Sequence, residues 1–167
     1  MKQVQAPSFP VRDHDHGLCM DGALWRAKSR FVEMGIKWTA LRERVFRQIA
    51  RSHESVSAYD LIESLAKDGK RLAPVSVYRI LEVLQAAGLV HRLESRNAFF
   101  ACMSEHENTR NTITFICDDC GRVTELDAPE AYQAIGEAIA VARFTSRRTM
   151  IEVSGVCGEC QHAAASC

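Results

Sequence analysis

The sequence predicts a chain of the α+β class in two parts, a helical part that ends in a β-hairpin and a smaller part of strands and helix. Apolar residues recur at helical spacing as far as Gly88 and then occur in short runs typical of strands. Beyond the hairpin, two C-x-x-C pairs each follow a predicted strand. We therefore expect a flexible tail at residues 1–22, a first domain at 23–102 and a metal-binding second domain at 103–167.

The composition is that of a globular protein, with 47% hydrophobic and 25% charged residues among 167. The sequence has no apolar run of about 18 residues, so we expect no membrane span. The N-terminus lacks the apolar core of a signal peptide, which favours a cytoplasmic location.

A zero net charge hides an asymmetry between the two parts. Residues 24–96 carry 14 Lys and Arg against 8 Asp and Glu, a net charge of +6, whereas residues 97–167 have a net charge of −5. A basic first part suits a polyanionic partner, and ordinary surface charge is the alternative interpretation.

The segment 1–22 contains Pro and Gly residues that interrupt any apolar period, which favours a disordered end. Three residues of metal-binding type lie in it, His14, His16 and Cys19. A metal-binding cluster at this end is the alternative to a plain tail.

The first two predicted helices are bounded by local signals. One begins near Leu24 and stops at Gly35, and Thr39 is placed to cap the next. The second helix has one apolar face, formed by Leu41, Val45, Phe46 and Ile49.

Two more helices follow before the change of period. Ser57 and Asp60 have the spacing of a capping box, and Gly69 closes this third helix. Pro74 suits the first turn of the fourth helix, and Gly88 suits the position after its end. The buried face of the fourth helix is predicted to contain Val77, Ile80, Leu81 and Leu84.

Residues 89–93 and 98–102 are predicted strands joined by a polar turn at 95–97. Helices followed by such a hairpin are typical of a winged helix-turn-helix domain. In the second part we expect strands at 112–117, 122–126 and 150–153, a helix at 129–142 and a short tail at 161–167.

The two C-x-x-C pairs carry the strongest chemical signal. Cys117 with Cys120 and Cys157 with Cys160 each place two thiolates on one tight turn. Two such turns can close a tetrahedral Zn²⁺ site that has no open position. A thioredoxin-like redox pair is the alternative, but neither pair lies in a βαβ frame. We therefore interpret the four cysteines as a structural zinc site.

The fourth predicted helix has the features of a recognition helix. Ser76, Tyr78 and Arg79 lie in its N-terminal turns, from which such helices contact base edges. Arginine can form two hydrogen bonds to guanine, and tyrosine can contact a thymine methyl group or a phosphate. A surface helix with a half-packed tyrosine is the alternative.

These motifs together resemble the ferric uptake regulator (Fur) family. The run Ser76-Val77-Tyr78-Arg79, followed by Gly88-Leu89-Val90, is similar to the family's T-V-Y-R recognition helix, with Ser in place of Thr. Thr39-Ala40-Leu41-Arg42 resembles the T-x-x-R start of the preceding helix. The run 57–61 is similar to that of the zinc uptake regulators, the branch of the family to which the sequence is closest. The resemblance covers roughly residues 24–160.

The resemblance implies a DNA-binding winged helix followed by an α/β dimerisation domain. It implies a homodimer that binds a palindromic operator in double-stranded DNA when metal is bound, and a repressor of zinc uptake and homeostasis genes. The four cysteines match the family's structural zinc site. Arg42 and Tyr59 are expected to add phosphate or sugar contacts to those of the recognition helix.

The resemblance also implies a second, regulatory Zn²⁺ site. His91, Cys102 and Glu125 match three of its four ligands by position. Arg110 stands at the fourth position, and arginine does not ligate metal. We expect His106, in the same polar segment, to supply the fourth ligand.

Other functions remain as alternatives. A regulator of the same family can sense iron, manganese or peroxide, but the run 111–116 lacks the His-rich sequence of many such sensors, and a cysteine ligand favours zinc. An enzyme is disfavoured because a four-cysteine site is closed and no general base accompanies an open one, so we expect no small-molecule substrate. A zinc-ribbon adaptor that binds only protein is a third alternative.

Overall fold

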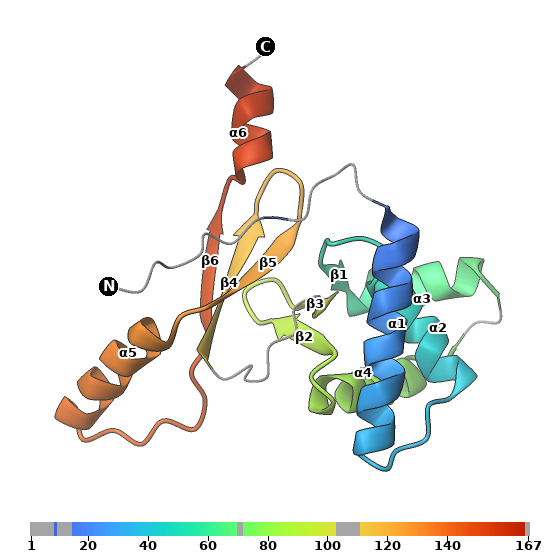
Figure 1. Ribbon diagram of the computed structural model, residues 1–167, viewed down its shortest axis with the longest axis horizontal. Helices are drawn as coiled ribbons and strands as arrows, with labels where there is room; N and C mark the ends of the chain where they lie inside the picture. The colour runs from blue at the N-terminus through green and yellow to red at the C-terminus, as the bar shows by residue number, and fades with distance from the viewer. Residues whose placement is uncertain (1–8, 10–14, 70–71, 103–110, 166–167) are drawn as a thin grey trace. The chain divides into compact units, whose positions relative to one another are not determined.

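The chain folds into two compact units, which are described separately (Figure 1). We call residues 11–103 the N-terminal unit, and residues 1–10 with 104–167 the C-terminal unit. The computed structural model describes residues 9, 15–69, 72–102 and 111–165. Among these residues, no helix combines the length and apolarity needed to cross a membrane.

The N-terminal unit is a winged helix-turn-helix domain, as predicted. Its four helices are α1 (His16–Glu33), α2 (Ala40–Ile49), α3 (Ala58–Lys67) and α4 (Pro74–Ala86). Its antiparallel sheet has the order β1-β3-β2 and consists of β1 (Val56–Ser57), β2 (Val90–Leu93) and β3 (Ala98–Ala101). The short strand β1 was not predicted, because two residues carry no alternation that a sequence pattern can detect.

Local signals set most of the helix boundaries as the sequence predicted. The hydroxyl of Thr39 accepts a hydrogen bond from the amide of Arg42 at 3.3 Å, and Ser57 accepts one from Asp60 at 3.1 Å. Each bond satisfies an amide that the first helical turn leaves without an internal partner. Gly88 ends α4 with a φ of 72°, a backbone conformation that favours glycine.

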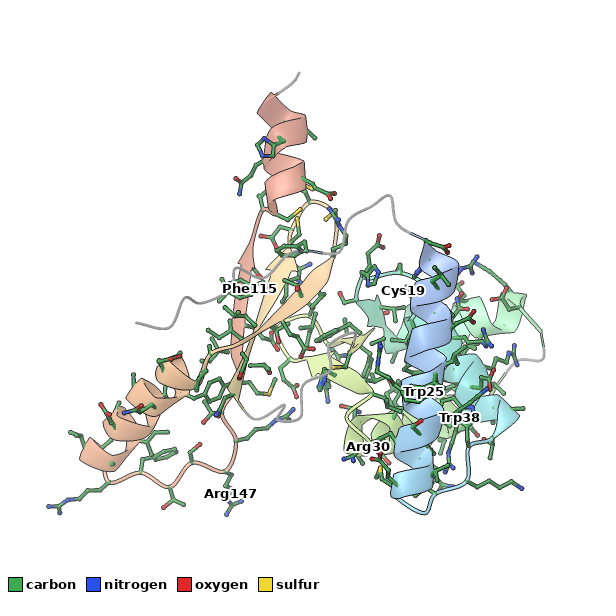
Figure 2. The ribbon with its side chains drawn as sticks, viewed as in Figure 1. Cys19, Trp25, Arg30, Trp38, Phe115 and Arg147 are labelled. Atoms are coloured by element: carbon green, nitrogen blue, oxygen red, sulfur yellow. The ribbon has the colours of Figure 1, made fainter. Side chains whose placement is uncertain are left out.

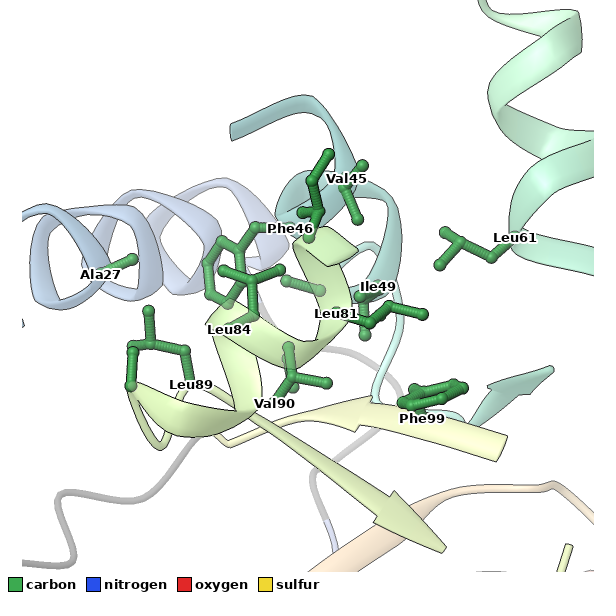
Figure 3. Close-up of a cluster of buried hydrophobic side chains, with 14 of the residues drawn as sticks. Ala27, Val45, Phe46, Ile49, Leu61, Leu81, Leu84, Leu89, Val90 and Phe99 are labelled. Atoms are coloured by element: carbon green, nitrogen blue, oxygen red, sulfur yellow. The ribbon is translucent and has the colours of Figure 1, made fainter. Parts of the chain in front are cut away.

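The helices bury one shared apolar core (Figure 3). The predicted face of α4 is buried in full, and Val45, Phe46 and Ile49 of α2 are no more than 1% exposed. Phe31 of α1 lies edge-on to Trp38, with ring centroids 4.8 Å apart. Truncating a buried aromatic side chain of this kind costs about 3–5 kcal/mol, so this core accounts for much of the stability of the unit.

Helix α1 begins earlier than predicted. The sequence places residues 1–22 in a flexible tail, but the structure is helical from His16. Asp15 explains the difference, because its carboxylate accepts hydrogen bonds from the amides of Gly17 and Leu18 at 3.0 and 3.2 Å. An N-cap of this kind compensates for the glycine in the first turn.

The C-terminal unit is built on a mixed sheet of order β5-β4-β6. Its strands are β4 (Thr112–Cys117), β5 (Val123–Asp127) and β6 (Ile151–Gly155), and its helices are α5 (Pro129–Val141) and α6 (Gly158–Ala165). Strand β4 pairs antiparallel with β5 and parallel with β6. The predicted tail at 161–167 is wrong as far as residue 165, because α6 continues through the second cysteine pair.

Glu43 of α2 supports a pH-dependent prediction of stability. Its carboxylate accepts hydrogen bonds from Trp38 Nε1 at 2.9 Å and from Arg47, and it lies 3.4 Å from Lys28 Nζ of α1. The hydrogen bond from Trp38 is the main cause that lowers the pKa of Glu43, with burial opposing it in part. A lowered pKa in the folded state means that the ionised carboxylate stabilises the fold above its unfolded pKa. This contribution is lost as the pH falls through the folded pKa.

We therefore expect Glu43→Gln to lower the free energy of unfolding by about 1 kcal/mol at neutral pH, and by progressively less below about pH 4. Urea unfolding followed by tryptophan fluorescence measures this, since Trp25 and Trp38 both belong to the N-terminal unit. Glu63→Gln, on an exposed position of α3, is the matched control and should change little. A loss that does not vary with pH would contradict the role given to the charge.

Candidate metal centre and nucleic-acid interface

The four predicted zinc ligands meet at one end of the C-terminal sheet. Cys117 ends β4 and lies opposite Gly155 at the end of β6, because these two strands run parallel. Cys120 follows in the turn after β4, while Cys157 lies just before α6 and Cys160 lies in the first turn of that helix. Parallel pairing thus brings two turns that are distant in sequence to the same edge of the sheet.

The spacing of the sulfur atoms fits a tetrahedral metal ion. One sulfur from each cysteine lies within 4.8 Å of the other three, and Cys120 Sγ is 3.8 Å from Cys157 Sγ. Four thiolates around Zn²⁺, each bonded at about 2.3 Å, lie about 3.8 Å apart. A disulfide would require about 2.05 Å. The cluster therefore has the dimensions of a closed Cys₄ zinc site.

Backbone contacts hold the two turns in place. Gly121 has a φ of 71° and donates its amide hydrogen to the carbonyl of Cys117 at 3.0 Å. The amide of Asp118 donates to the Gly155 carbonyl at 2.7 Å, and the amide of Cys157 donates to Cys117 Sγ at 3.3 Å. An amide directed at a sulfur favours the thiolate that binds metal.

Arg122 is a component of this centre that the sequence analysis missed. Its side chain is 6% exposed, and it donates to Cys120 Sγ at 3.2 Å and to Cys157 Sγ at 3.5 Å. Glu159 Oε2 accepts a further hydrogen bond from it at 2.6 Å. The available sequence signal is an arginine two residues after one C-x-x-C pair, combined with a glutamate inside the other.

The guanidinium changes the acidity of the thiol beside it. Burial alone would raise the pKa of Cys120, but hydrogen bonds from Arg122 and neighbouring groups lower that pKa to about 6. Burial likewise opposes the charge of Arg122, whereas its bonds to Glu159 and Cys120 raise its pKa. Cys120 is therefore disposed to be a thiolate at neutral pH.

The predicted DNA-reading residues lie where α4 begins. Tyr78 is 48% exposed, Arg79 is exposed and Ser76 is half-buried. Val77, between Ser76 and Tyr78, and Ile80, directly after Arg79, are buried in the core. The helix therefore presents one polar face to solvent. Val75 is 62% exposed on the first turn and is an apolar neighbour that the sequence analysis did not select.

The two residues expected to contact phosphate or sugar groups, Tyr59 and Arg42, differ in their surroundings. Tyr59 is 73% exposed near the start of α3, where it is free of the core. Arg42 is half-buried, donates to the carbonyl of Lys37 and lies with its guanidinium carbon 5.4 Å from the Phe31 ring centroid. Arg42 thus already supports the fold of the N-terminal unit, in addition to any contact with DNA.

The residues predicted for regulatory zinc lie in both units. In the N-terminal unit, His91 on β2 and Cys102 after β3 offer ligand atoms within 4.8 Å of each other. The His91 ring packs against Phe100, with centroids 5.5 Å apart. In the C-terminal unit, Glu125 lies on β5 opposite Thr114. His106 and Arg110 lie outside the described residues.

The metal-binding cluster that the sequence suggested at the N-terminus contains different residues in the structure. His16 and Cys19 of α1 lie together with His53, which belongs to the turn between α2 and β1. The sequence analysis did not include His53, because it is 34 positions from Cys19. His14 lies outside the described residues.

A winged helix-turn-helix unit joined to a unit with a four-cysteine centre defines a class of metal-dependent DNA-binding proteins. The chain belongs to the ferric uptake regulator family, whose family model matches residues 33–154. This confirms the resemblance found in the sequence.

Known proteins of this family resemble the chain over most of its length. The zinc uptake regulation protein of Escherichia coli (strain K12) is 31% identical over 137 residues, which cover 82% of this chain and 80% of that protein. A solved zinc uptake regulator complexed with zinc and DNA has a TM-score of 0.80 and 30% identity, covering 87% of this chain and 97% of that one. The crystal structure of holo XcZur has a TM-score of 0.72 and 29% identity, covering 89% and 99%.

Proposed function

We propose that the protein is a zinc-responsive transcriptional repressor that binds a palindromic operator in double-stranded DNA as a homodimer and controls zinc uptake and homeostasis genes. The observation that carries this proposal is the likeness, at a TM-score of 0.80, to a zinc uptake regulator solved with zinc and DNA. The four-cysteine centre and the exposed polar face of α4 supply the two activities that such a regulator requires.

The cysteine centre holds structural zinc in this proposal. Its four sulfurs complete the coordination of the ion, which leaves no position for a substrate or an activated water. The role of the site is therefore to stabilise the C-terminal unit, and the protein acts as a regulator rather than as an enzyme. Because operator DNA is its proposed partner and its relatives come from bacteria, we assign it to the cytoplasm.

The homodimer is supported by the surface of the C-terminal unit. Helix α5 has no buried residue, although it is rich in alanine and contains Ile135 and Ile139. Val141 and Phe144, at and beyond its end, are 87% and 66% exposed. An apolar surface of this kind favours burial against another protein surface, and a second copy of the chain provides it.

DNA recognition is assigned to the first turns of α4. Arg79 and Tyr78 contact base edges, and Ser76 adds a contact at the same end of the helix. Tyr59 and Arg42 contact phosphate or sugar groups, which fix the position of the domain on the duplex. The net charge of +6 in residues 24–96 favours approach to DNA.

Regulatory zinc is assigned to His91, Cys102, Glu125 and His106. Imidazole, thiolate and carboxylate are all zinc ligands, and the spacing of His91 and Cys102 within the N-terminal unit suits a shared ion. The ligands belong to both units of the chain, so that bound zinc can select the DNA-binding conformation from an ensemble.

A regulator that senses iron, manganese or peroxide is the second candidate. It is favoured by the likeness to a peroxide-responsive repressor of Staphylococcus aureus, 26% identical over 132 residues. Cys102 at the regulatory position favours zinc, because thiolate is a softer ligand than those preferred by manganese. Operator binding measured with each metal in turn separates these candidates.

Loss of one cysteine of the four-cysteine centre should remove the structural zinc. We expect Cys117→Ser to retain less zinc and to lose the folded C-terminal unit or the dimer, because metal binding at such sites is coupled to folding. Zinc content and sedimentation measure both effects, and Cys167→Ser, at the last residue of the chain, is the control for removing a thiol. A folded, zinc-free Cys117→Ser dimer would be incompatible with the assignment.

Arg79→Ala should abolish specific binding while preserving the fold and the zinc. Losing a two-hydrogen-bond contact between arginine and guanine costs about 1–3 kcal/mol, or roughly 5- to 150-fold in affinity. Operator affinity at fixed salt measures this effect. Arg147→Ala removes the same charge from an exposed position of the C-terminal unit (Figure 2) and should leave operator affinity nearly unchanged. Equal affinities of Arg79→Ala and the wild type would reject the role of Arg79.

His106→Ala should weaken zinc-dependent operator binding and leave the Cys₄ zinc in place, because it removes one of four regulatory ligands. Cys102→Ala is the comparison variant, and zinc titration of operator binding is the measurement. A zinc response that is intact in His106→Ala but lost in Cys102→Ala would retain the site and reject His106 as its fourth ligand.

A further inference from the structure

A third group of metal-binding side chains lies in the N-terminal unit, apart from the two sites already assigned. His16, Cys19 and His53 each offer a ligand atom within 4.8 Å of the other two. Cys19 Sγ is 3.9 Å from His53 Nε2, and the rings of His16 and His53 are 5.4 Å apart between centroids at an angle of 36°. All three side chains are half-buried.

The fold explains why these residues meet. Asp15 caps α1, which places His16 in its first turn and Cys19 three residues later on the same face of the helix. Helix α2 ends before Ala50, and the turn that follows carries His53 back towards α1. Figure 2 shows Cys19 on α1, near the end from which the helix begins. The cluster therefore joins two segments that are distant in sequence within a single compact unit.

A contact at His16 orients its ring for metal binding. His16 Nε2 is in hydrogen-bond contact with the backbone carbonyl of Arg51. A carbonyl oxygen only accepts, so Nε2 must carry the hydrogen, and the neutral ring then has its lone pair on Nδ1. Histidine ligands of metals commonly have this arrangement, with the second ring nitrogen bonded to a backbone carbonyl or a carboxylate.

We propose that His16, Cys19 and His53 form a further zinc site, with His16 bound through Nδ1 and His53 through Nε2. Zn–S and Zn–N bonds of about 2.3 and 2.0 Å in a tetrahedron place sulfur and nitrogen about 3.6 Å apart. The separation of 3.9 Å between Cys19 Sγ and His53 Nε2 is close to this value. One thiolate and two imidazoles are a ligand set suited to Zn²⁺, and the fourth position is left to water or a small external ligand.

The ion would connect the start of α1 to the turn that leads into β1 and α3. That turn lies only a few residues before Ser57, which caps α3, and before Tyr59, the exposed residue on its first turn. Zinc bound here stabilises the end of the N-terminal unit at which α1 begins, because the metal binds the folded arrangement of three ligands more tightly than the unfolded chain.

Cobalt spectroscopy of the full-length protein tests the proposal. Co²⁺ reports a bound thiolate through a sulfur-to-metal charge-transfer band, and the Cys102→Ala background removes the thiolate of the proposed regulatory site. We expect Cys102→Ala protein that carries a single Zn²⁺ per chain, in the Cys₄ centre, to develop this band when it is titrated with Co²⁺. Adding Cys19→Ser should abolish the band, and adding His53→Gln should weaken Co²⁺ binding at least about 10-fold, since the loss of a group that only orients a metal ligand already costs about that much.

Cys102→Ala/Cys167→Ser is the matched control, since it removes a thiol outside the cluster and should keep the band. Equal bands in Cys102→Ala and Cys102→Ala/Cys19→Ser would overturn the proposal, and so would the absence of any band in Cys102→Ala. Cobalt that enters the Cys₄ centre gives a tetrathiolate band that is the same in all variants. The difference spectrum between variants with and without Cys19 removes this common band. A charge-transfer band that remains in the difference spectrum supports the proposal, and its absence overturns it. Circular dichroism shows whether the Cys19→Ser variant is folded. If it is not, His16→Ala takes its place and should weaken Co²⁺ binding.

Discussion

The parallel pairing of β4 with β6 is the contact on which the C-terminal unit depends. It places Cys117 opposite Gly155 and brings Cys120 to 3.8 Å from Cys157, although the latter two are 37 positions apart in sequence. The buried cluster at this end of the sheet consists of cysteines, with Phe9 packed against it. Because the buried cluster described at this end is small, metal coordination would add to the stability of the unit.

Charge balance is the second requirement of that centre. Four thiolates around a divalent cation leave a net charge of −2 in a buried place, which is unfavourable without a compensating cation. Arg122 supplies one positive charge from a buried position, and its Nη2 donates to Glu159 Oε2 at 2.6 Å as well as to Cys157 Sγ at 3.5 Å. The local order is thiolates, guanidinium, carboxylate, with each charge adjacent to one of opposite sign.

The parts of the fold and of the candidate sites that the sequence predicts are those set by residues close together in the chain. The caps at Thr39 and Ser57 and the stop at Gly88 were predicted from neighbours in sequence, and the structure confirms them. The start of α1 was not predicted because Gly17 and Gly22 interrupt the apolar period, and the capping role of Asp15 is seen only in the structure. His53 and Arg122 were missed because their partners lie 34 to 37 positions away, where only the folded chain shows the contact.

The exposed face of α5 connects the C-terminal unit to the kind of DNA sequence that the protein reads. Helix α5 is tied to its own unit by the hydrogen bond from Tyr132 to the Thr112 carbonyl at 2.9 Å, but none of its residues is fully buried there, so a partner surface would bury its apolar side chains. When two identical chains pair through the same surface, the assembly has two-fold symmetry. The two copies of α4 are then related by that symmetry, and each can enter a major groove. Such helices contact half-sites about 34 Å apart or a multiple of that distance, and the half-sites must be inverted copies of each other. In the proposed repressor, a palindromic operator would follow from pairing through α5, while Tyr78 and Arg79 are the residues proposed to read the bases.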